Sequence, residues 1–560
     1  MTARGFVIGG SIALVAYLAL VPLGFLAWQS VQVADGTGST RLALDHYRAA
    51  WSDGSTPRLV VNSVRFAAAT SLFAFAIGTL LAFVNERTNV PFKRLFYTLS
   101  IVPLVIPGVL FVVAWILLGS PKIGLVNLAL QRLTGFDAVF VDVYTLWGMA
   151  FVDGLHYSPL AFLLMSAAFR AIDPALEEAA LTSGAGIVAI AWHITFRLAW
   201  PAAFATLLIL FVRALESFEV PALLGLPAGI QVFTSAIYAA MHRYPANVGL
   251  ACAYAVMLLA LTSLGLWLQS RLTVRGERHA TLSGRGYRRR PIDLGAFRWP
   301  VSALSMLYFL LLVGLPFLVL LWSSFQTFYA VPSRAALGRL TLEPYRFVLG
   351  FPAIGRATLN SIALAAGSAT AIMLVTAVVC WVVVRSKMRG RALLDALASL
   401  PIVFPGLVLG LALMVFYLHV DVAVYGTLWI LFIAYATRFL PYGIRYNTAS
   451  MLGIHRELEE SAAVSGASWW TTFRLVVLPL LRPGFIAGWI YIAIVAIREL
   501  SSSILLYAPG SEVLSVVIWE LWENGQYVEL SALGVLMTLA LFALVMIAQP
   551  FAGRLVARAA

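Results

Sequence analysis

Charged residues are scarce in this chain. Of its 560 residues, only 11% are Asp, Glu, Lys or Arg, whereas 61% are hydrophobic. A soluble globular protein carries about 25% charged residues on average, so this sequence has too few of them to cover a water-exposed surface. The scarcity excludes an ordinary soluble enzyme and a disordered chain, and it favours a protein whose solvent is the lipid bilayer.

Cysteine and lysine are also rare. The two cysteines, Cys252 and Cys380, lie within apolar segments, so we expect neither a disulfide framework nor a thiolate metal site. The three lysines are Lys93, Lys122 and Lys387, and none of them follows a glycine. The sequence therefore contains no Gly-x-x-x-x-Gly-Lys phosphate-binding loop. The seven histidines are scattered, and no run of metal ligands and no nucleophile elbow accompanies them.

The apolar residues are concentrated in twelve runs, most of them about twenty residues long, which is the length that a helix needs to cross a bilayer. These runs lie near 6–28, 59–84, 95–118, 144–168, 202–220, 248–269, 300–322, 358–384, 394–417, 424–443, 484–506 and 530–552. The first run lacks a clear small-residue cleavage site before Gln29, so we interpret it as a retained span. We predict an all-α polytopic membrane protein with about twelve transmembrane helices.

The distribution of arginine sets the expected orientation. The net charge is +13, and basic residues cluster between alternate spans, above all in 271–298 and 385–391. Because cytoplasmic loops are enriched in Lys and Arg, this pattern places both termini in the cytoplasm. It also accounts for the basic charge without nucleic-acid binding.

The two halves of the chain resemble each other. The matching pairs, all at an offset of 298, are Asn62 and Asn360, Ser63 and Ser361, Pro103 and Pro401, and Pro107 and Pro405. An even number of spans per half keeps both halves in one orientation, which predicts two parallel six-helix repeats with the solute path between them. We assign 1–270 to a first transmembrane domain, 271–299 to a basic cytoplasmic linker and 300–560 to a second transmembrane domain. The proline pairs either break spans three and nine or mark the starts of helices.

One loop in each half carries the same pattern of residues. The first runs Glu177-Glu178-Ala179-Ala180-Leu181-Thr182-Ser183-Gly184, and the second runs Glu459-Glu460-Ser461-Ala462-Ala463-Val464-Ser465-Gly466. Acidic residues favour the first turn of a helix, and glycine ends a helix because it tolerates a positive φ. Each loop is predicted to form a short helix, a glycine break and a second, amphipathic helix. Such a pair offers a rigid projection to a partner protein.

These loops resemble the glutamate-alanine-alanine loops of permeases from binding-protein-dependent ABC transporters of the type I importer kind. In that family the loop supplies a coupling helix that docks in a cleft of the ATPase subunit. The resemblance implies the type I importer membrane-domain fold, and it assigns ATPase coupling to Glu178, Ala179, Ala180, Gly184, Glu460, Ser461, Ala462 and Gly466. The second loop keeps the family spacing from Gly466 to Pro479. The distance from Gly184 to Pro201 is four residues longer, or about one helical turn.

The resemblance also implies how the work is divided among subunits. This chain would be a permease with both membrane domains fused, without catalytic activity or a cofactor of its own. ATP and Mg²⁺ would bind two separate ATPase subunits, expected to form a homodimer. A periplasmic or lipid-anchored binding protein would deliver a small solute at the bacterial inner membrane. The fused form resembles iron(III) and thiamine importer permeases, and Arg498-Glu499-Leu500 resembles a segment of the iron(III) permeases. Ferric iron is therefore the predicted solute, with thiamine, a polyamine, a phosphonate or a sugar phosphate as alternatives.

Charged residues inside apolar spans are candidates for a translocation pathway. Glu216 and Glu219 lie in the fifth span, and Arg498 and Glu499 lie in the eleventh. Carboxylates in matching places of the two halves would attract a cation. The alternative is a structural role, in which Glu216 or Glu219 pairs with Arg213.

Two other classes of protein are alternatives to the permease. An ion-coupled secondary transporter with two sets of six spans would explain the span count and the membrane carboxylates, but it would not explain the paired glycine-broken loops. A membrane enzyme has no support, because the sequence shows no convergent cluster of acid, base or metal-binding residues.

Overall fold

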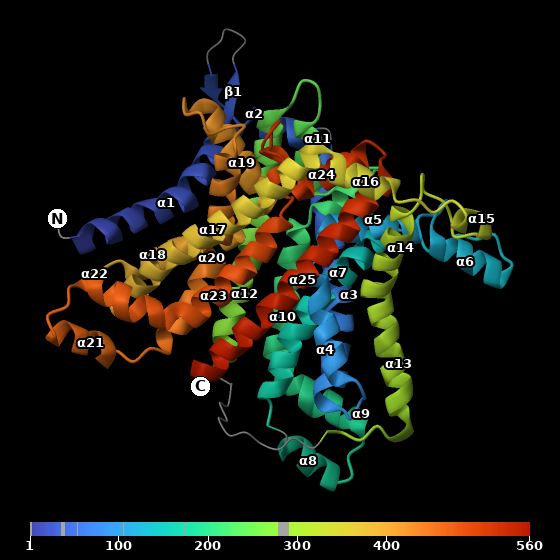
Figure 1. Cartoon of the computed structure of the whole chain (residues 1–560), viewed down its shortest axis with the longest axis horizontal. Helices are drawn as coiled ribbons and strands as arrows, with labels where there is room; N and C mark the ends of the chain where they lie inside the picture. The colour runs from blue at the N-terminus through green and yellow to red at the C-terminus, as the bar shows by residue number, and fades with distance from the viewer. Residues whose placement is uncertain are drawn as a thin grey trace. The chain divides into compact units, whose positions relative to one another are not determined.

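The computed structural model describes residues 3–34, 40–52, 54–104, 106–173, 175–277 and 291–559 (Figure 1). Residues 278–290 of the predicted basic linker lie outside this set. The described chain is almost entirely helical, and its two strands, β1 (Gln32–Ala34) and β2 (Thr40–Leu42), form one antiparallel hairpin. The predicted all-α membrane fold is confirmed.

Each of the twelve predicted apolar runs coincides with one long helix or with helices separated by a short break. Up to the linker the helices are α1 (Ala3–Ser30), α2 (Asp45–Ser52), α3 (Ser55–Arg87), α4 (Lys93–Ile101), α5 (Gly108–Gly119), α6 (Leu125–Thr134), α7 (Leu146–Ala171), α8 (Ala175–Thr182), α9 (Ile187–Ile190), α10 (Phe196–Glu216), α11 (Phe233–Met241) and α12 (Val248–Glu277). After the linker they are α13 (Arg298–Phe309), α14 (Leu315–Ser324), α15 (Arg334–Leu337), α16 (Glu343–Gly350), α17 (Pro352–Arg385), α18 (Arg391–Ser399), α19 (Gly406–His419), α20 (Leu428–Leu452), α21 (Glu457–Val464), α22 (Trp469–Thr472), α23 (Leu478–Ile497), α24 (Leu514–Glu523) and α25 (Tyr527–Ala559).

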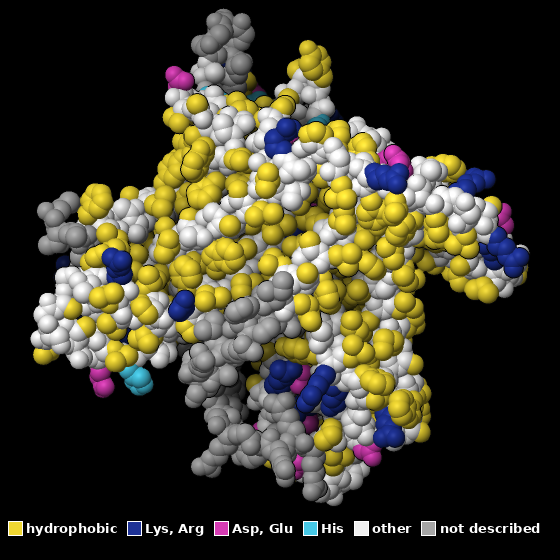
Figure 2. Space-filling view, in the orientation of Figure 1, with side chains coloured by type: hydrophobic (Ala, Val, Ile, Leu, Met, Phe, Trp, Pro, Cys, Tyr) yellow, Lys and Arg dark blue, Asp and Glu magenta, His cyan; other side chains and the backbone are white. Residues whose placement is uncertain are grey.

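Fewer continuous spans are present than apolar runs. Among the described residues, eight helical segments are long and apolar enough to cross a membrane, or ten if each of two bent helix pairs is one span. Their outer surfaces are apolar: Leu359, Ile362 and Leu374 of α17 are all exposed, and hydrophobic side chains cover much of the face in Figure 2. Soluble proteins rarely expose such extended apolar surface, whereas lipid accommodates it.

The chain packs into two units that combine helices from both halves of the sequence. One unit comprises residues 1–49, 243–259 and 345–560, and the other comprises 50–242 and 260–344. Within the first unit, α1 packs on α18 and α19, and the hydroxyls of Tyr17 and Tyr417 lie 2.5 Å apart. Within the second, α14 packs on α5. The packed units cross the domain boundaries at 270 and 300, which stay a prediction from the sequence repeat.

The third apolar run of each half is broken at the matching prolines. In the first half, α4 and a 3-10 turn (Val102–Leu104) precede α5, whose N-cap is Pro107. In the second half, α18 and a 3-10 turn (Leu400–Val403) precede α19, whose N-cap is Pro405, and the chain bends there by 105°. Both alternatives for the proline pairs are therefore present, since the spans are broken and Pro107 and Pro405 mark the starts of helices. It also places the N-termini of α5 and α19 in the buried interior of their units.

Close packing of α3 against α7 forms the centre of the second unit. A Cβ atom on Gly78 would lie 2.5 Å from both the Ala161 Cβ and the Ser158 carbonyl oxygen, so no side chain fits there. Small residues let membrane helices approach closely and gain van der Waals contact.

Replacing Gly78 tests this packing. We expect Gly78→Val to destabilise the protein by about 1–3 kcal/mol, because an overpacked helix interface must separate. Thermal unfolding in detergent would measure the loss. Gly355→Val in α17 is the matched control, since no heavy atom lies within 4 Å of a Cβ built there. Equal stability of the two variants would contradict the packing argument.

Candidate functional site: paired loops and buried charges

The two loops predicted from the sequence end their first helices in the same way. The Gly184 and Gly466 amides donate to the carbonyls of Leu181 and Ala463, and the next amides, Ala185 and Ala467, donate to Ala180 and Ala462, all at 3.0 Å. This is the Schellman arrangement, which needs a left-handed residue after the helix. Both glycines have a φ of 81°. The helix and glycine break expected from each loop pattern are therefore present.

The second part of each loop also matches its counterpart. α9 and α22 have four residues each and continue through five-residue π-helical turns, Ala191–Thr195 and Phe473–Val477, into α10 and α23. Pro201 corresponds to Pro483 at the loop offset of 282, not to Pro479. The interpretation that the first loop contains an additional turn is therefore wrong, because the two loops have equal length.

A buried ion pair holds the first loop helix in place. Glu177 Oε2 lies 3.3 Å from Nη1 of Arg87, the last residue of α3, and the two side chains are only 7% and 4% exposed. The Thr195 hydroxyl donates to Glu177 Oε1 at 2.6 Å. Arg87 also donates to the Ile172 carbonyl at 3.2 Å, at the end of α7. One arginine thus joins α3, the end of α7 and the start of α8.

The second half repeats this ion pair at equivalent positions. Arg385, the last residue of α17, places its Nε atom 3.0 Å from Glu459 Oε1. Trp381 donates to Glu459 Oε2 at 2.8 Å, and Arg385 also donates to the carbonyls of Met451, in the last turn of α20, and of Ile454, just beyond it. A cation is favourable beside the carbonyls that end a helix. We call these two pairs, Arg87–Glu177 and Arg385–Glu459, the tethers.

The residues assigned to coupling lie mainly on the outside of the loops. Gly184, Ser461 and Gly466 are exposed, and Glu460 is exposed and only 3.7 Å from Arg456 in a surface pair. Glu178, Ala180 and Ala462 are half-buried, and Ala179 is exposed. Sequence reasoning missed the inward partners because it treated Arg87 and Arg385 only as topology-setting charges. The sequence did contain a signal for these ion pairs. Arg87 and Arg385 are separated by the repeat offset of 298, and Glu177 and Glu459 are separated by the loop offset of 282.

The predicted pathway residues of the fifth span take different positions. Glu216 lies at the end of α10 and forms an ion pair with Arg213 at 3.3 Å, which is the pairing that the structural alternative predicted. The Glu219 carboxyl carbon would lie 3.5 Å from a Cβ on Gly108, the first residue of α5. Glu219 therefore sits at the positive end of a helix dipole, which favours a carboxylate.

The predicted residues of the eleventh span lie where α23 ends. Arg498 is the C-cap of α23, and Glu499 is buried. Glu499 Oε2 lies 3.3 Å from Arg438 Nε of α20, and its Oε1 atom accepts hydrogen bonds from the Ser502 amide and hydroxyl. The Arg438 guanidinium fills the space that a side chain on Gly406 would need, at the start of α19.

Two charged residues of this region were missed. Arg438 lies in α20, and Asp153 lies in α7, where its Oδ1 atom accepts a hydrogen bond from Ser217 at 3.2 Å. Both stand inside predicted spans, so the rule that flags ionisable residues within membranes would have found them.

Two repeated sets of apolar helices, each with a glycine-broken loop tethered to a long span, define a two-domain membrane permease. The family described as the inner membrane component of binding-protein-dependent transport systems matches residues 74–275 and 375–560. The chain belongs to this family, which confirms the resemblance seen in the loops.

Proteins that are similar to this chain in sequence also carry permease names. A ferric transport system permease protein of Actinobacillus pleuropneumoniae is 25% identical, over 88% of this chain and 71% of its own. An Fe(3+)-transport system permease protein of Haemophilus influenzae is 25% identical, over 84% and 85%. A spermidine/putrescine transport system permease protein of Escherichia coli is 24% identical over 44% of this chain and 89% of its own.

The tether predicts unequal effects of two adjacent glutamates. We expect Glu177→Gln to lower stability by about 3–5 kcal/mol, because it removes the negative partner of a buried arginine. Glu178→Gln should have little effect, since Glu178 is half-buried and forms no ion pair with the described residues. Thermal inactivation of the purified protein compares them. A Glu178→Gln protein that is as unstable as Glu177→Gln would refute the assignment.

Proposed function

We propose that this chain is the permease subunit of an ATP-driven importer and that its two loops receive the ATPase subunits. The observation that carries the proposal is the identical construction of the loops, each with a Schellman-terminated helix and a tether to a span. A matched pair of projections suits a partner with two equivalent clefts. Family membership argues against the ion-coupled secondary transporter, which has no use for such loops.

In this proposal the tethers transmit movement. ATP and Mg²⁺ bind two ATPase subunits, which dock on 175–195 and 457–477 around Gly184 and Gly466. When these subunits close, they displace α8 and α21. The buried ion pairs pass the displacement to the ends of α3 and α17, since separating a buried pair is costly. A solute-binding protein on the opposite side of the membrane delivers the solute.

A substitution in the second loop tests the coupling role. We expect Gly466→Asp to abolish uptake and stimulated ATP hydrolysis in a reconstituted complex, because it strains the left-handed position and adds charge at the docking surface. Gly525→Asp is the control, since Gly525 also has a positive φ, of 73°, and open space around it, at the end of α24. Normal assembly and uptake by Gly466→Asp would disprove the coupling role.

Ferric iron is the solute that we propose. The long relatives carry ferric transport names, and a trivalent cation favours hard oxygen ligands. Glu219 and Glu499 supply carboxylates near the broken spans, one at the start of α5 and one paired with Arg438 near the start of α19. Thiamine, a phosphonate, a sugar phosphate and a polyamine are the alternatives, and the polyamine has the spermidine/putrescine relative in its favour.

The solute and the carboxylates can be tested together. We expect ATP hydrolysis to rise when the binding protein carries ferric ion and to stay basal with thiamine, spermidine or a phosphorylated solute. Glu219→Gln combined with Glu499→Gln should reduce uptake while ATPase binding persists, because the path loses its negative charge. Glu529→Gln at the start of α25 is the control. Stimulation by another solute would exclude iron, and unchanged uptake by the double variant would exclude the carboxylates.

A further inference from the structure

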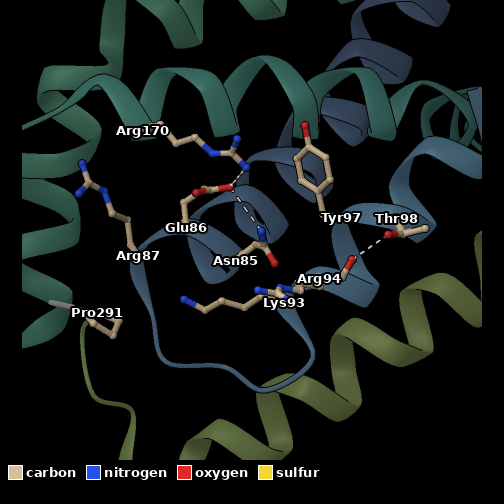
Figure 3. Close-up of a pocket in the computed structure, with 9 residues that line it drawn as sticks. All are labelled: Asn85, Glu86, Arg87, Lys93, Arg94, Tyr97, Thr98, Arg170 and Pro291. Atoms are coloured by element: carbon tan, nitrogen blue, oxygen red, sulfur yellow. Dashed lines mark hydrogen bonds and ion pairs between the residues drawn. The ribbon is translucent and has the colours of Figure 1, made fainter. Parts of the chain in front are cut away.

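A pocket of about 670 Å³ opens at one end of α3, α4 and α7, beside the tether residue Arg87 (Figure 3). Its lining residues are Asn85, Glu86, Arg87, Lys93, Arg94, Tyr97, Thr98, Arg170 and Pro291. Four of these side chains are cationic, whereas Glu86 is the one acid among them. All nine belong to the second packed unit.

Two of the four cations already have partners. Arg170 forms a 2.6 Å pair with Glu86 and lies over the Tyr97 ring, 5.1 Å from its centroid. Arg87 belongs to the first tether. These contacts hold the side chains on one side of the pocket in place. Figure 3 shows Arg170, Glu86 and Asn85 next to one another there.

Lys93 and Arg94 carry the excess positive charge. Neither forms an ion pair with any residue that the structure describes. Lys93 is half-buried, and this burial lowers the pKa of its ammonium group. The nearby Glu86 carboxylate has the opposite, smaller effect of raising that pKa. Figure 3 shows Lys93 extending between Arg87 and Pro291 into the open part of the pocket. An anion placed there would supply the missing negative charge.

The backbone that presents these two residues is strained. Phe92, immediately before α4, has a φ of 65°, the one positive value for a non-glycine residue in the described chain. A left-handed conformation is unfavourable for a bulky side chain and is maintained only where the surroundings enforce it. At the matching position the second half has Gly390, which adopts a φ of 93° without a side chain.

The second half does not repeat the pocket. Glu86 corresponds to Val384, and Arg170 corresponds to Leu452. Lys93 corresponds to Arg391, which donates to the Ser386 carbonyl at 3.1 Å. The shared fold therefore does not require this cluster, and its charges serve something particular to the first half.

The surroundings of the pocket are those of a membrane surface. Ile292 exchanges backbone hydrogen bonds with Arg87 and Asn89, and the exposed aromatic residues Phe297 and Trp299 follow within seven residues. Trp is enriched at the boundary between lipid and water. α13 continues from there and packs on α4, where Phe309 stacks on Phe96 at 5.6 Å.

We propose that this pocket binds the phosphate group of an anionic phospholipid, with its acyl chains along the exposed apolar surfaces of α4 and α13. Basic pockets between membrane helices are known to hold such headgroups. Leu95 and Leu304 are among the exposed residues of these surfaces. The proposal does not depend on the transported solute or on the ATPase partners.

Binding of short-chain phosphatidylglycerol to the delipidated full-length protein tests the proposal, with phosphatidylcholine as the neutral comparison. We expect Lys93→Gln combined with Arg94→Gln to weaken phosphatidylglycerol binding by about ten- to thirtyfold, since each basic residue near a membrane surface contributes about 1 kcal/mol to anionic lipid binding. Lys387→Gln combined with Arg389→Gln is the control. It removes the same charge from the corresponding connection of the second half, and it should change the affinity less than about threefold.

Three outcomes would overturn the proposal. Equal weakening by both double variants would mean unspecific attraction to basic loops. Inorganic phosphate that binds as tightly as phosphatidylglycerol would identify a free anion as the ligand. Failure of the charge-conserving variant Lys93→Arg with Arg94→Lys to retain phosphatidylglycerol binding, at unchanged thermal stability, would show that charge at this site is not what binds the lipid.

Discussion

A carboxylate in an apolar environment needs a counter-charge, and in each half the first glutamate of the loop finds it in the arginine that ends the longest span helix. Because Arg87 and Arg385 also hold the carbonyls at the ends of α7 and α20, each arginine fixes three helices at one point. The loop helix cannot move without either carrying the span with it or separating a buried pair. Each exposed loop is thereby attached to the end of a long helix, as the proposed coupling requires.

The third apolar run of each half is broken in the same way, and this is the second feature that the halves share. Pro107 and Pro405 are the N-caps of α5 and α19, so two helix N-termini, whose first amides have no intrahelical partner, lie in the buried interior. The halves fill this position differently. Glu219 approaches Gly108, whereas Gly406 is approached by Arg438, which forms an ion pair with Glu499. Different side chains thus occupy the two helix starts, which makes the two halves chemically unequal around a shared backbone.

The sequence was sufficient for features that one physical rule determines. The bilayer thickness fixes the length of an apolar run, so the runs located the helices, and the need for a positive φ located Gly184 and Gly466. Features that depend on packing could not be predicted. Glu177 and Glu178 differ by one residue, or about 100° around a helix, and only the assembled fold decides which of them faces Arg87. The pairing of α1 with α18 and α19 likewise leaves no trace in the apolar pattern of α1, because lipid and protein interior demand the same side chains. The supposed insertion in the first loop arose from aligning Pro201 with Pro479 when Pro483 was the equivalent residue.

The two halves therefore agree where they would meet a symmetric partner and differ where they would meet an asymmetric one. Loop length, Schellman turn, π-helical turn and tether are repeated residue for residue, as two equal docking sites require. The buried charges beside α5 and α19 are not repeated, and neither is the basic pocket beside α4. The proposed ligands of these sites, a solute and a lipid, have no two-fold symmetry of their own. Because the two halves are fused into one chain, the side chains at these sites can differ between the halves. The loops keep the same structure because the partners that they are proposed to share require it.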